Sequence, residues 1–379
     1  MSAVDCAQTM PDDVVYKLWW ILPWNSETSS FSVIQHIYTL TYILSHLRIR
    51  NISIMSTVHD HSRVWFITGT SQGIGRALLE ELLISGDRVV ATLRNPTTLS
   101  SLSSQYPSTQ LLILPLDVTN PSQITSAFEA TKNHFGRIDV LVNNAGYGLQ
   151  GEIETTPDEE ARKVMEVLFW GPVNICKQAI PFMRDINPPG TGGLILNVST
   201  VGGYSANPGL AFYSAGKFAL EGFTESLTKE MHPKWNIKAH ILELGGFRTE
   251  WSGSSMKNLP TLLSIYASED SPTEKMRRIR SEKYIGDPGN AAKAFRTIAE
   301  IHFQVNGNKS LKDSSSDGDG DVGKLPLRIQ LGTDSSLIVG FKAKQTMEDA
   351  RNWEDFAATT NANDVDKEKL VERLKVVFS

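Results

Sequence analysis

Short apolar runs alternate with amphipathic stretches along the chain from residue 64 onward. The apolar runs predict strands at 64–67, 88–93, 111–116, 140–142, 193–199, 237–242 and 325–331. The amphipathic stretches predict helices at 74–84, 124–135, 157–183 and 213–231, and from about 338 onward. Such alternation is typical of β–α–β units, so we expect an α/β fold with a doubly wound parallel sheet. Ligands of such sheets bind beyond the carboxyl ends of the strands.

Two segments interrupt this alternation. Between 246 and 286 we expect a helical lid over the cleft, because bulky apolar residues continue there without strand spacing; among them are Trp251, Met256, Leu262, Leu263 and Tyr266. Residues 306–323 are rich in Ser and Asp, which predicts a disordered acidic insertion. We therefore expect a single domain at 61–358 that contains this insertion, followed by a C-terminal helical tail at 359–379.

Residues 1–60 form an extension that does not share the pattern. Its apolar run at 31–47 is short and polar for a membrane span, and acidic residues precede it, which is unlike a signal peptide. Three interpretations stay open: a membrane-surface helix, a disordered tail, or sequence upstream of the true start. The position of Met55, shortly before the first strand, favours the third. Contact with a membrane is expected only through residues 14–50.

Composition narrows the class of protein. The chain has 379 residues, 40% of them hydrophobic, which is enough for one large domain with a core. Its net charge is −5 and it has no basic stripe, so we expect no nucleic-acid partner. Two cysteines, Cys6 and Cys176, are too few for a disulfide scaffold and favour a reducing, cytoplasmic location. We interpret Cys176 as a small buried residue, and we expect no metal site.

A glycine-rich turn follows the first predicted strand and opens the first helix. Gly69, Gly73 and Gly75 have Gly-x-x-x-Gly-x-Gly spacing. Glycines let the backbone approach a pyrophosphate, and a helix N-terminus favours its negative charge. A turn of this kind also occurs for steric reasons alone, so by itself it is weak evidence.

Three further strand ends carry polar side chains. Arg94 stands at a position where proteins that bind a cofactor with a free ribose hydroxyl usually have an acidic residue. Its guanidinium can instead pair with a 2′-phosphate, so this residue favours NADP(H) over NAD. Asp117 can accept a hydrogen bond from an adenine amino group, or cap a helix. Asn143 and Asn144 precede Ala145 and Gly146, which is typical of close backbone approach to a cofactor or of an ordinary turn.

The decisive signal is a serine at a strand end followed by a tyrosine and lysine one helical turn apart. These residues are Ser199, Tyr213 and Lys217. A free phenol ionises near pH 10, and an ammonium at about 4 Å can lower the pKa of a phenol by two to three units. We therefore expect Tyr213 to be an acid/base and Ser199 to hold the substrate oxygen. A surface pair at i and i+4 is the alternative, and the preceding glycine turn and serine argue against it.

Together these motifs resemble those of the short-chain dehydrogenase/reductase family, over about residues 63–358. The residues at 243–249 and 286–288 resemble a subgroup with many fungal members, which is similar to 17β-hydroxysteroid dehydrogenases and often found in secondary metabolism. The family implies a Rossmann-type fold, a homo-oligomer, Ser199 as the substrate-orienting residue, Tyr213 as acid/base and Lys217 on the ribose. It also implies cofactor contacts at Ile74, Asp117, Asn144, Phe247 and Thr249.

Two residues depart from the family pattern. Leu168 stands where the family usually has an Asn that orders a water in the proton relay, and Leu244 replaces a Pro after the sixth strand.

We expect an NADP(H)-dependent oxidoreductase that acts on a small apolar ketone or secondary alcohol under the lid. The alternatives are a non-catalytic NADP-binding sensor or scaffold, for which Leu168 is the only support, and a membrane-associated form of the enzyme.

Overall fold

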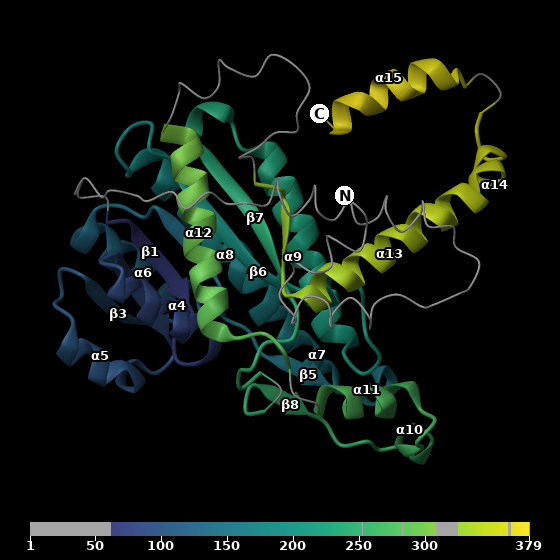
Figure 1. Ribbon diagram of the computed structural model, residues 1–379, viewed down its shortest axis with the longest axis horizontal. Coiled ribbons are helices and arrows are strands. Elements are labelled where there is room, and N and C mark those ends of the chain that lie inside the picture. The colour runs from purple at the N-terminus through teal and green to yellow at the C-terminus, as the bar shows by residue number, and fades with distance from the viewer. Residues whose placement is uncertain (1–61, 252, 282–283, 308–324, 363–364, 379) are drawn as a thin grey trace, which may run out of the picture. The chain divides into compact units, whose positions relative to one another are not determined.

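The structure is a computed structural model that describes residues 62–251, 253–281, 284–307, 325–362 and 365–378. The predictions for the N-terminal extension and for most of the acidic insertion fall outside these residues. Seven parallel strands form the central sheet in the order β3-β2-β1-β4-β6-β7-β9 (Figure 1). They are β1 (Val64–Thr68), β2 (Arg88–Leu93), β3 (Leu111–Pro115), β4 (Val140–Asn143), β6 (Gly193–Thr200), β7 (Ile237–Leu244) and β9 (Arg328–Leu331). The strand order reverses beside β1, which confirms the doubly wound Rossmann-type sheet and places a crevice at its carboxyl edge.

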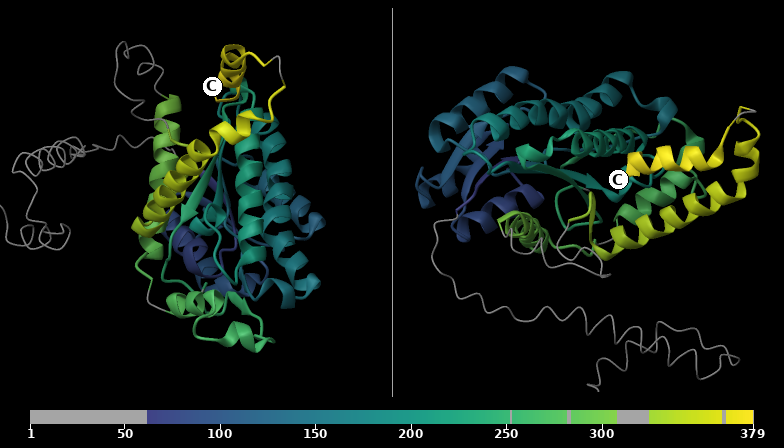
Figure 2. Two further views of the ribbon diagram at one scale, coloured as in Figure 1. Left: turned by 90° about the vertical axis from the view of Figure 1, so that its right-hand side faces the viewer. Right: turned by 90° about the horizontal axis from the view of Figure 1, so that it is seen from above.

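Helices cover both faces of this sheet, as the two views of Figure 2 show. One face carries α4 (Gly73–Ile84), η1 (Pro96–Leu99), α5 (Ser100–Gln105) and α12 (Pro288–Gly307). The other carries α6 (Pro121–Phe135), α8 (Gly171–Asp185) and α9 (Ala211–Glu230). The predicted helix 157–183 is three consecutive segments: α7 (Asp158–Met165), the π-helical η3 (Glu166–Trp170) and α8. Short turns η4 (Val201–Gly203) and η5 (Pro233–Trp235) flank α9.

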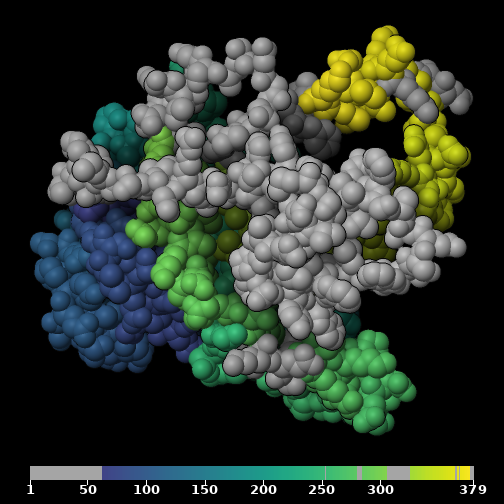
Figure 3. Space-filling view, viewed as in Figure 1, coloured from purple at the N-terminus to yellow at the C-terminus, as the bar shows by residue number. Residues whose placement is uncertain are grey.

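The lid at 246–286 is helical only in part, which corrects the sequence prediction. It contains β8 (Met256–Asn258), α10 (Ser264–Ala267) and α11 (Pro272–Ser281). Strand β8 pairs in parallel with β5 (Gly148–Gln150), which precedes the turn η2 (Ile153–Thr155). Three-residue strands are too short for a period-2 pattern to stand out, so the sequence did not reveal them. Figure 3 shows the lid, in green, gathered along the lower edge of the surface, where its near end meets the purple residues.

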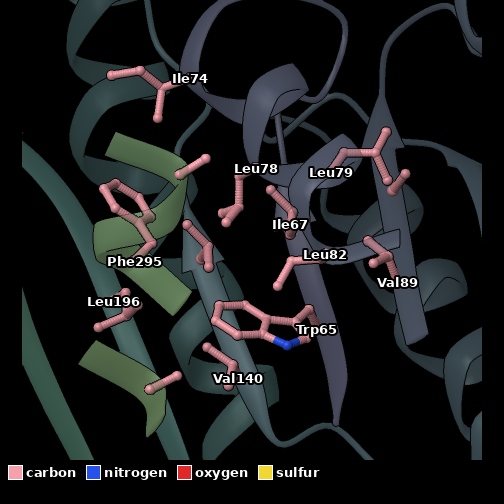
Figure 4. Packing of buried hydrophobic residues seen from close by; sticks show 14 of the residues in the cluster. Trp65, Ile67, Ile74, Leu78, Leu79, Leu82, Val89, Val140, Leu196 and Phe295 are labelled. Carbon is pink, nitrogen blue, oxygen red and sulfur yellow. The ribbon is translucent and has the colours of Figure 1, made fainter. Parts of the chain in front are cut away.

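Between the sheet and helices α4 and α12 lies a close-packed apolar core (Figure 4). Trp65, Leu78 and Phe295 are fully buried there. The indole nitrogen of Trp65 donates to Asp87 Oδ2 at 3.2 Å, so this large side chain brings no unpaired polar atom into the core. Truncating such a residue to Ala typically costs about 3–5 kcal/mol. The core therefore fixes the strand ends on which the cleft is built.

The C-terminal part is helical, as expected, but begins earlier than the pattern indicated. It comprises α13 (Thr333–Asn352), α14 (Glu354–Ala358) and α15 (Lys367–Phe378). At the start of α13, Asp334 Oδ2 accepts a hydrogen bond of 2.6 Å from the backbone nitrogen of Gly246, which joins this helix to the start of the lid. Among the described residues, no helix combines the length and the apolar character that crossing a bilayer demands.

Candidate active site

A cleft of about 1270 Å³ opens at the carboxyl edge of the sheet, between the strand ends and the lid. Most of the residues predicted to bind a cofactor line it: Gly69, Gly73, Ile74, Arg94, Asp117, Asn144, Tyr213, Lys217, Phe247 and Thr249. These positions are far apart in the sequence, and the parallel sheet brings them together because every strand ends at the same edge.

The glycine turn has the backbone geometry that the sequence predicted. Gly69 and Gly73 have φ of +72° and +61°, a region in which side chains other than glycine are strained. A Cβ on Gly69 would lie 2.8 Å from the Cα of Ala145. Gln72, the residue before α4, makes no side-chain cap, and no acidic residue stands in the first turn of α4. The N–H groups at this helix end therefore remain suited to an anion.

Gly75 has a different role from the predicted one. It does not line the cleft, and a Cβ there would approach both the side-chain nitrogen of Asn144 and the carbonyl oxygen of Gly69 to 2.4 Å. Asn144 Nδ2 donates to the carbonyl oxygens of Thr68 and Gly69 at 2.9 and 3.0 Å. Gly75 thus makes room for an amide that ties the end of β1 to the end of β4.

Arg94 and Asp117 stand on the cofactor side of the cleft. Arg94 is exposed and forms neither an ion pair nor a hydrogen bond with any residue that the structure describes. Its guanidinium is available to a phosphate. Asp117 Oδ1 accepts hydrogen bonds from the backbone and hydroxyl of Thr119, at 2.9 and 2.7 Å, so this oxygen orders the loop before α6.

Two neighbouring hydroxyls at the end of β6 lie in different surroundings. Ser199 is 2% exposed, and its Oγ donates to Glu221 Oε1 at 2.6 Å, in the interior. The side chains of Thr200 and Tyr213 meet beside Gly202, where an added Cβ would lie 3.3 Å from Thr200 Cγ2 and 3.7 Å from Tyr213 Cε1. The hydroxyl of Thr200 donates to the carbonyl oxygen of Leu244 at 3.0 Å. Both residues line the cleft, but the Ser199 hydroxyl is engaged with Glu221, so Thr200 becomes a second candidate for the role predicted for Ser199. The hydroxyl beside Tyr213 is that of Thr200.

Tyr213 and Lys217 are both buried in the first turns of α9, on one face of the helix. Burial raises the pKa of Tyr213 above its ordinary value of 10.0, although the nearby polar side chains of Thr200 and Trp251 oppose the shift. Burial also disfavours the charged form of Lys217, which lowers its pKa to about 8, and the charge of Glu221 opposes that shift. Lys217 Nζ donates to the carbonyl oxygen of Val198 at 2.7 Å. The expected effect of Lys217 on the pKa of Tyr213 stays a prediction, because burial is the largest influence on this phenol.

Comparison with known proteins shows which family the chain belongs to. A short chain dehydrogenase family profile matches residues 63–259. The chain is 35% identical over 300 residues to the oxidoreductase calM of Penicillium decumbens, covering 78% of this chain and 91% of that protein. It is 30% identical to a short-chain dehydrogenase from Streptomyces avermitilis, with a TM-score of 0.67 over 80% of this chain and all of the other. The chain belongs to the short-chain dehydrogenase/reductase family. A family member from Burkholderia cenocepacia, solved in complex with NADP, is 22% identical with a TM-score of 0.54, over 77% of this chain and 97% of that one, and shares the fold.

Leu168 departs from the family pattern in a way that the structure explains. Its side chain is fully buried within the π-helical segment η3 and packs in one cluster with Leu149, Val164, Leu210, Tyr213 and Met256. A Cβ on Gly146 would lie 3.0 Å from Leu168 and 4.0 Å from Lys217 Nζ. An apolar side chain therefore fills the space beside the lysine, and no polar group of residue 168 can order a water there.

Three residues around this short-chain dehydrogenase/reductase site have positions that the sequence did not predict. Thr200 directly follows Ser199, and the alternation of side chains along a strand could have raised it as the other candidate. Glu221 follows Lys217 by one turn of α9, so helical spacing places it on the same face. Trp251 was noted only as a bulky lid residue, but its ring lies 5.3 Å from that of Tyr213, centroid to centroid.

Cys176 agrees with its interpretation as a packing residue. It is free and fully buried, and burial raises the pKa of its thiol to about 12. A thiol with that pKa forms almost no thiolate at neutral pH, so Cys176 is not a nucleophile here.

Proposed function

We propose that this protein is an NADP(H)-dependent oxidoreductase that interconverts a ketone and a secondary alcohol. The observation that carries the proposal is that Tyr213 and Thr200 line the cleft side by side, with Lys217 one helical turn further along α9. A phenol and a second hydroxyl that converge on one point can bind a single carbonyl oxygen. The rest of the cleft then has to hold a hydride donor and the remainder of the substrate.

The residues on the cofactor side fit a dinucleotide. The turn at Gly69 admits a close approach of the pyrophosphate, and the N-terminus of α4 carries no competing cap. Exposed Arg94 favours the 2′-phosphate of NADP(H) over the free hydroxyl of NAD. The NADP complex of the Burkholderia cenocepacia protein supports the same choice. When bound, NADP(H) supplies or accepts the hydride.

The chain's own residues move the proton. In reduction, Tyr213 donates the phenolic proton to the carbonyl oxygen while Thr200 hydrogen-bonds the same oxygen. Because burial raises the pKa of Tyr213, the phenol keeps this proton at neutral pH and is ready to act as the acid. Lys217 then stabilises the phenolate that remains. In oxidation, the alcohol proton passes back to the oxygen of Tyr213.

An apolar substrate could pack against the aromatic, thioether and aliphatic side chains that line part of the cleft. These are Tyr147, Leu210, Trp251, Met256, Met276, Ile279 and Tyr284. The subgroup resemblance extends the proposal to a role in secondary metabolism. Copies would pair through the long helices α8 and α9, near which Trp170 and Phe218 leave 47% and 45% of their surfaces exposed.

Replacing Tyr213 with Phe tests the function directly. We expect Tyr213→Phe to lose about 1000-fold in kcat for NADPH-dependent reduction of apolar ketones, because the proton donor is gone. NADPH binding, followed by fluorescence titration, should stay unchanged. Tyr106→Phe, a Tyr packed against the core away from the cleft, is the matched control and should keep full activity. Normal turnover by Tyr213→Phe would refute the mechanism. A wild-type protein that binds NADPH but reduces no ketone of a broad panel would support a non-catalytic NADP-binding protein.

A further inference from the structure

The turn that follows β7 forms part of the cleft on the side proposed for the cofactor. Residues 244–247 and Thr249 line the cleft. The far end of this turn reaches the glycine turn, because a Cβ on Gly73 would lie 3.5 Å from Cβ of Thr249. Leu244 stands where the family usually has a Pro, so no proline ring fixes the backbone where the chain leaves the sheet. The shape of the turn then depends on contacts from other parts of the chain.

The first turn of the C-terminal helix α13 supplies such a contact. Oδ2 of Asp334 accepts a hydrogen bond of 2.6 Å from the backbone nitrogen of Gly246. A bond between a carboxylate and a backbone N–H is charge-assisted and stronger than a bond between neutral groups. Asp334 itself lines the cleft, and so does Ile338, one helical turn further along α13. The C-terminal helix therefore belongs to the wall of the cleft.

Two glycines make room for this carboxylate. A Cβ on Gly245 would overlap Asp334 Oδ1, and a Cβ on Gly332 would lie 2.6 Å from the same oxygen. Gly332 also has a φ of +105°, which residues with a side chain rarely adopt. Oδ1 is buried and accepts no hydrogen bond from any residue that the structure describes, which is costly for a carboxylate. The contact of Oδ2 with the turn, and not packing, therefore accounts for a carboxylate at this place.

The next residue of α13 offers an internal comparison. Ser335 is fully buried, and its hydroxyl donates to the carbonyl oxygen of Glu243 at 2.8 Å. Glu243 lies within β7 and does not line the cleft. Ser335 thus attaches α13 to the strand, whereas Asp334 reaches the turn beyond it. Because the helix has this separate attachment, the position of the turn can be tested apart from the docking of the helix.

We propose that Asp334 is a positioning residue for the cofactor: from the C-terminal helix it holds the N–H of Gly246, and so fixes the turn that presents Phe247 and Thr249 to the cleft. The inference rests on the proposed function, since it takes NADP(H) to be the occupant of this side of the cleft. It also gives α13 a part in the active site, although this helix lies outside residues 63–259, which the family profile matches.

Asp334→Ala tests this role through the Kd for NADPH, measured by fluorescence titration of the full chain. We expect the Kd to rise about tenfold, the order expected when a hydrogen bond to a charged group is lost. Asp334→Asn keeps an oxygen that can accept from Gly246 and should restore the wild-type Kd. Ser335→Ala is the matched control, because it removes the neighbouring bond of α13. It should lower the thermal stability and leave the Kd unchanged.

Three results of this titration would overturn the inference. The first is a wild-type Kd in Asp334→Ala. The second is an equal rise in Asp334→Ala and Ser335→Ala, because the docking of α13 would then set the affinity. The third is a Kd in Asp334→Asn as weak as in Asp334→Ala, because the hydrogen bond to Gly246 would then not be the cause.

A second measurement needs no variant, and so does not depend on whether Asp334→Ala folds. Coupling between two sites is reciprocal, so saturating NADPH should slow the hydrogen exchange of the Gly246 amide about tenfold. The amide of Gly136, which bonds the carbonyl oxygen of Lys132 at the end of α6, lies outside the cleft and is the control. Unchanged exchange at Gly246 would also overturn the inference.

The same titration separates this inference from the proposed function. A wild-type chain that bound no NADPH would refute the proposed function and the role of Asp334 together. A wild-type chain that binds NADPH, combined with any of the overturning results at Asp334 or Gly246, would refute only the role of Asp334.

Discussion

The two walls of the cleft are built in different ways. The cofactor wall consists of strand ends and the turns that follow them, so the ladder of parallel strands fixes its geometry. The substrate wall belongs largely to the lid at 246–286. Two ion pairs between side chains hold this lid: Lys257 with Glu160 at 2.7 Å, and Arg277 with the buried Glu152. The first wall can keep its shape for one cofactor, whereas the second can vary with the substrate without disturbing the sheet.

At the boundary between the two walls, the hydroxyl pair of Ser199 and Thr200 gives the largest effect expected after that of Tyr213→Phe. Thr200→Val keeps the shape of the side chain and removes the hydroxyl beside Tyr213, so kcat should fall about 100-fold. Ser199→Ala should change kcat little. It should lower the free energy of unfolding by about 1–3 kcal/mol instead, because Glu221 loses a buried hydrogen bond. Steady-state kinetics and urea unfolding of both variants decide the assignment. A reversed pattern would return the substrate-orienting role to Ser199.

The same boundary shows how far the sequence leads. The strands, the glycine turn and the face shared by Tyr213 and Lys217 follow from spacing, because backbone period and turn chemistry are local properties. The choice between two adjacent hydroxyls is not local, since it depends on which face of β6 meets α9. The direction of the Tyr213 pKa shift depends on desolvation, which the whole cleft determines. The lid was only partly foreseen because short strands and side-chain clamps leave no period in the sequence.

A matched pair of variants compares the walls directly. Arg94→Ala should raise KM for NADPH about tenfold and leave KM for NADH unchanged, because only the 2′-phosphate contact is lost. Glu152→Gln weakens the clamp to Arg277 and should raise KM for the ketone by a similar factor with KM for NADPH unchanged. The four constants come from initial rates at saturating second substrate. If both variants changed both KM values alike, the two walls would act as a single unit.

The smallest expected effect concerns stability. Behind the site, Glu221 accepts a hydrogen bond from Ser199, pairs with Arg328 and lies near the buried Glu243. Burial raises the pKa of Glu221 from 4.5 to about 7. Between these values the folded chain keeps a proton that the unfolded chain has lost, so this contribution to stability is full below pH 4.5 and declines as pH rises through 7. Glu221→Gln cannot titrate, so its free energy of unfolding should vary less over this range, by on the order of 1–2 kcal/mol. Urea unfolding at several pH values measures this, and an unchanged slope would mean that Glu221 is already ionised in the fold.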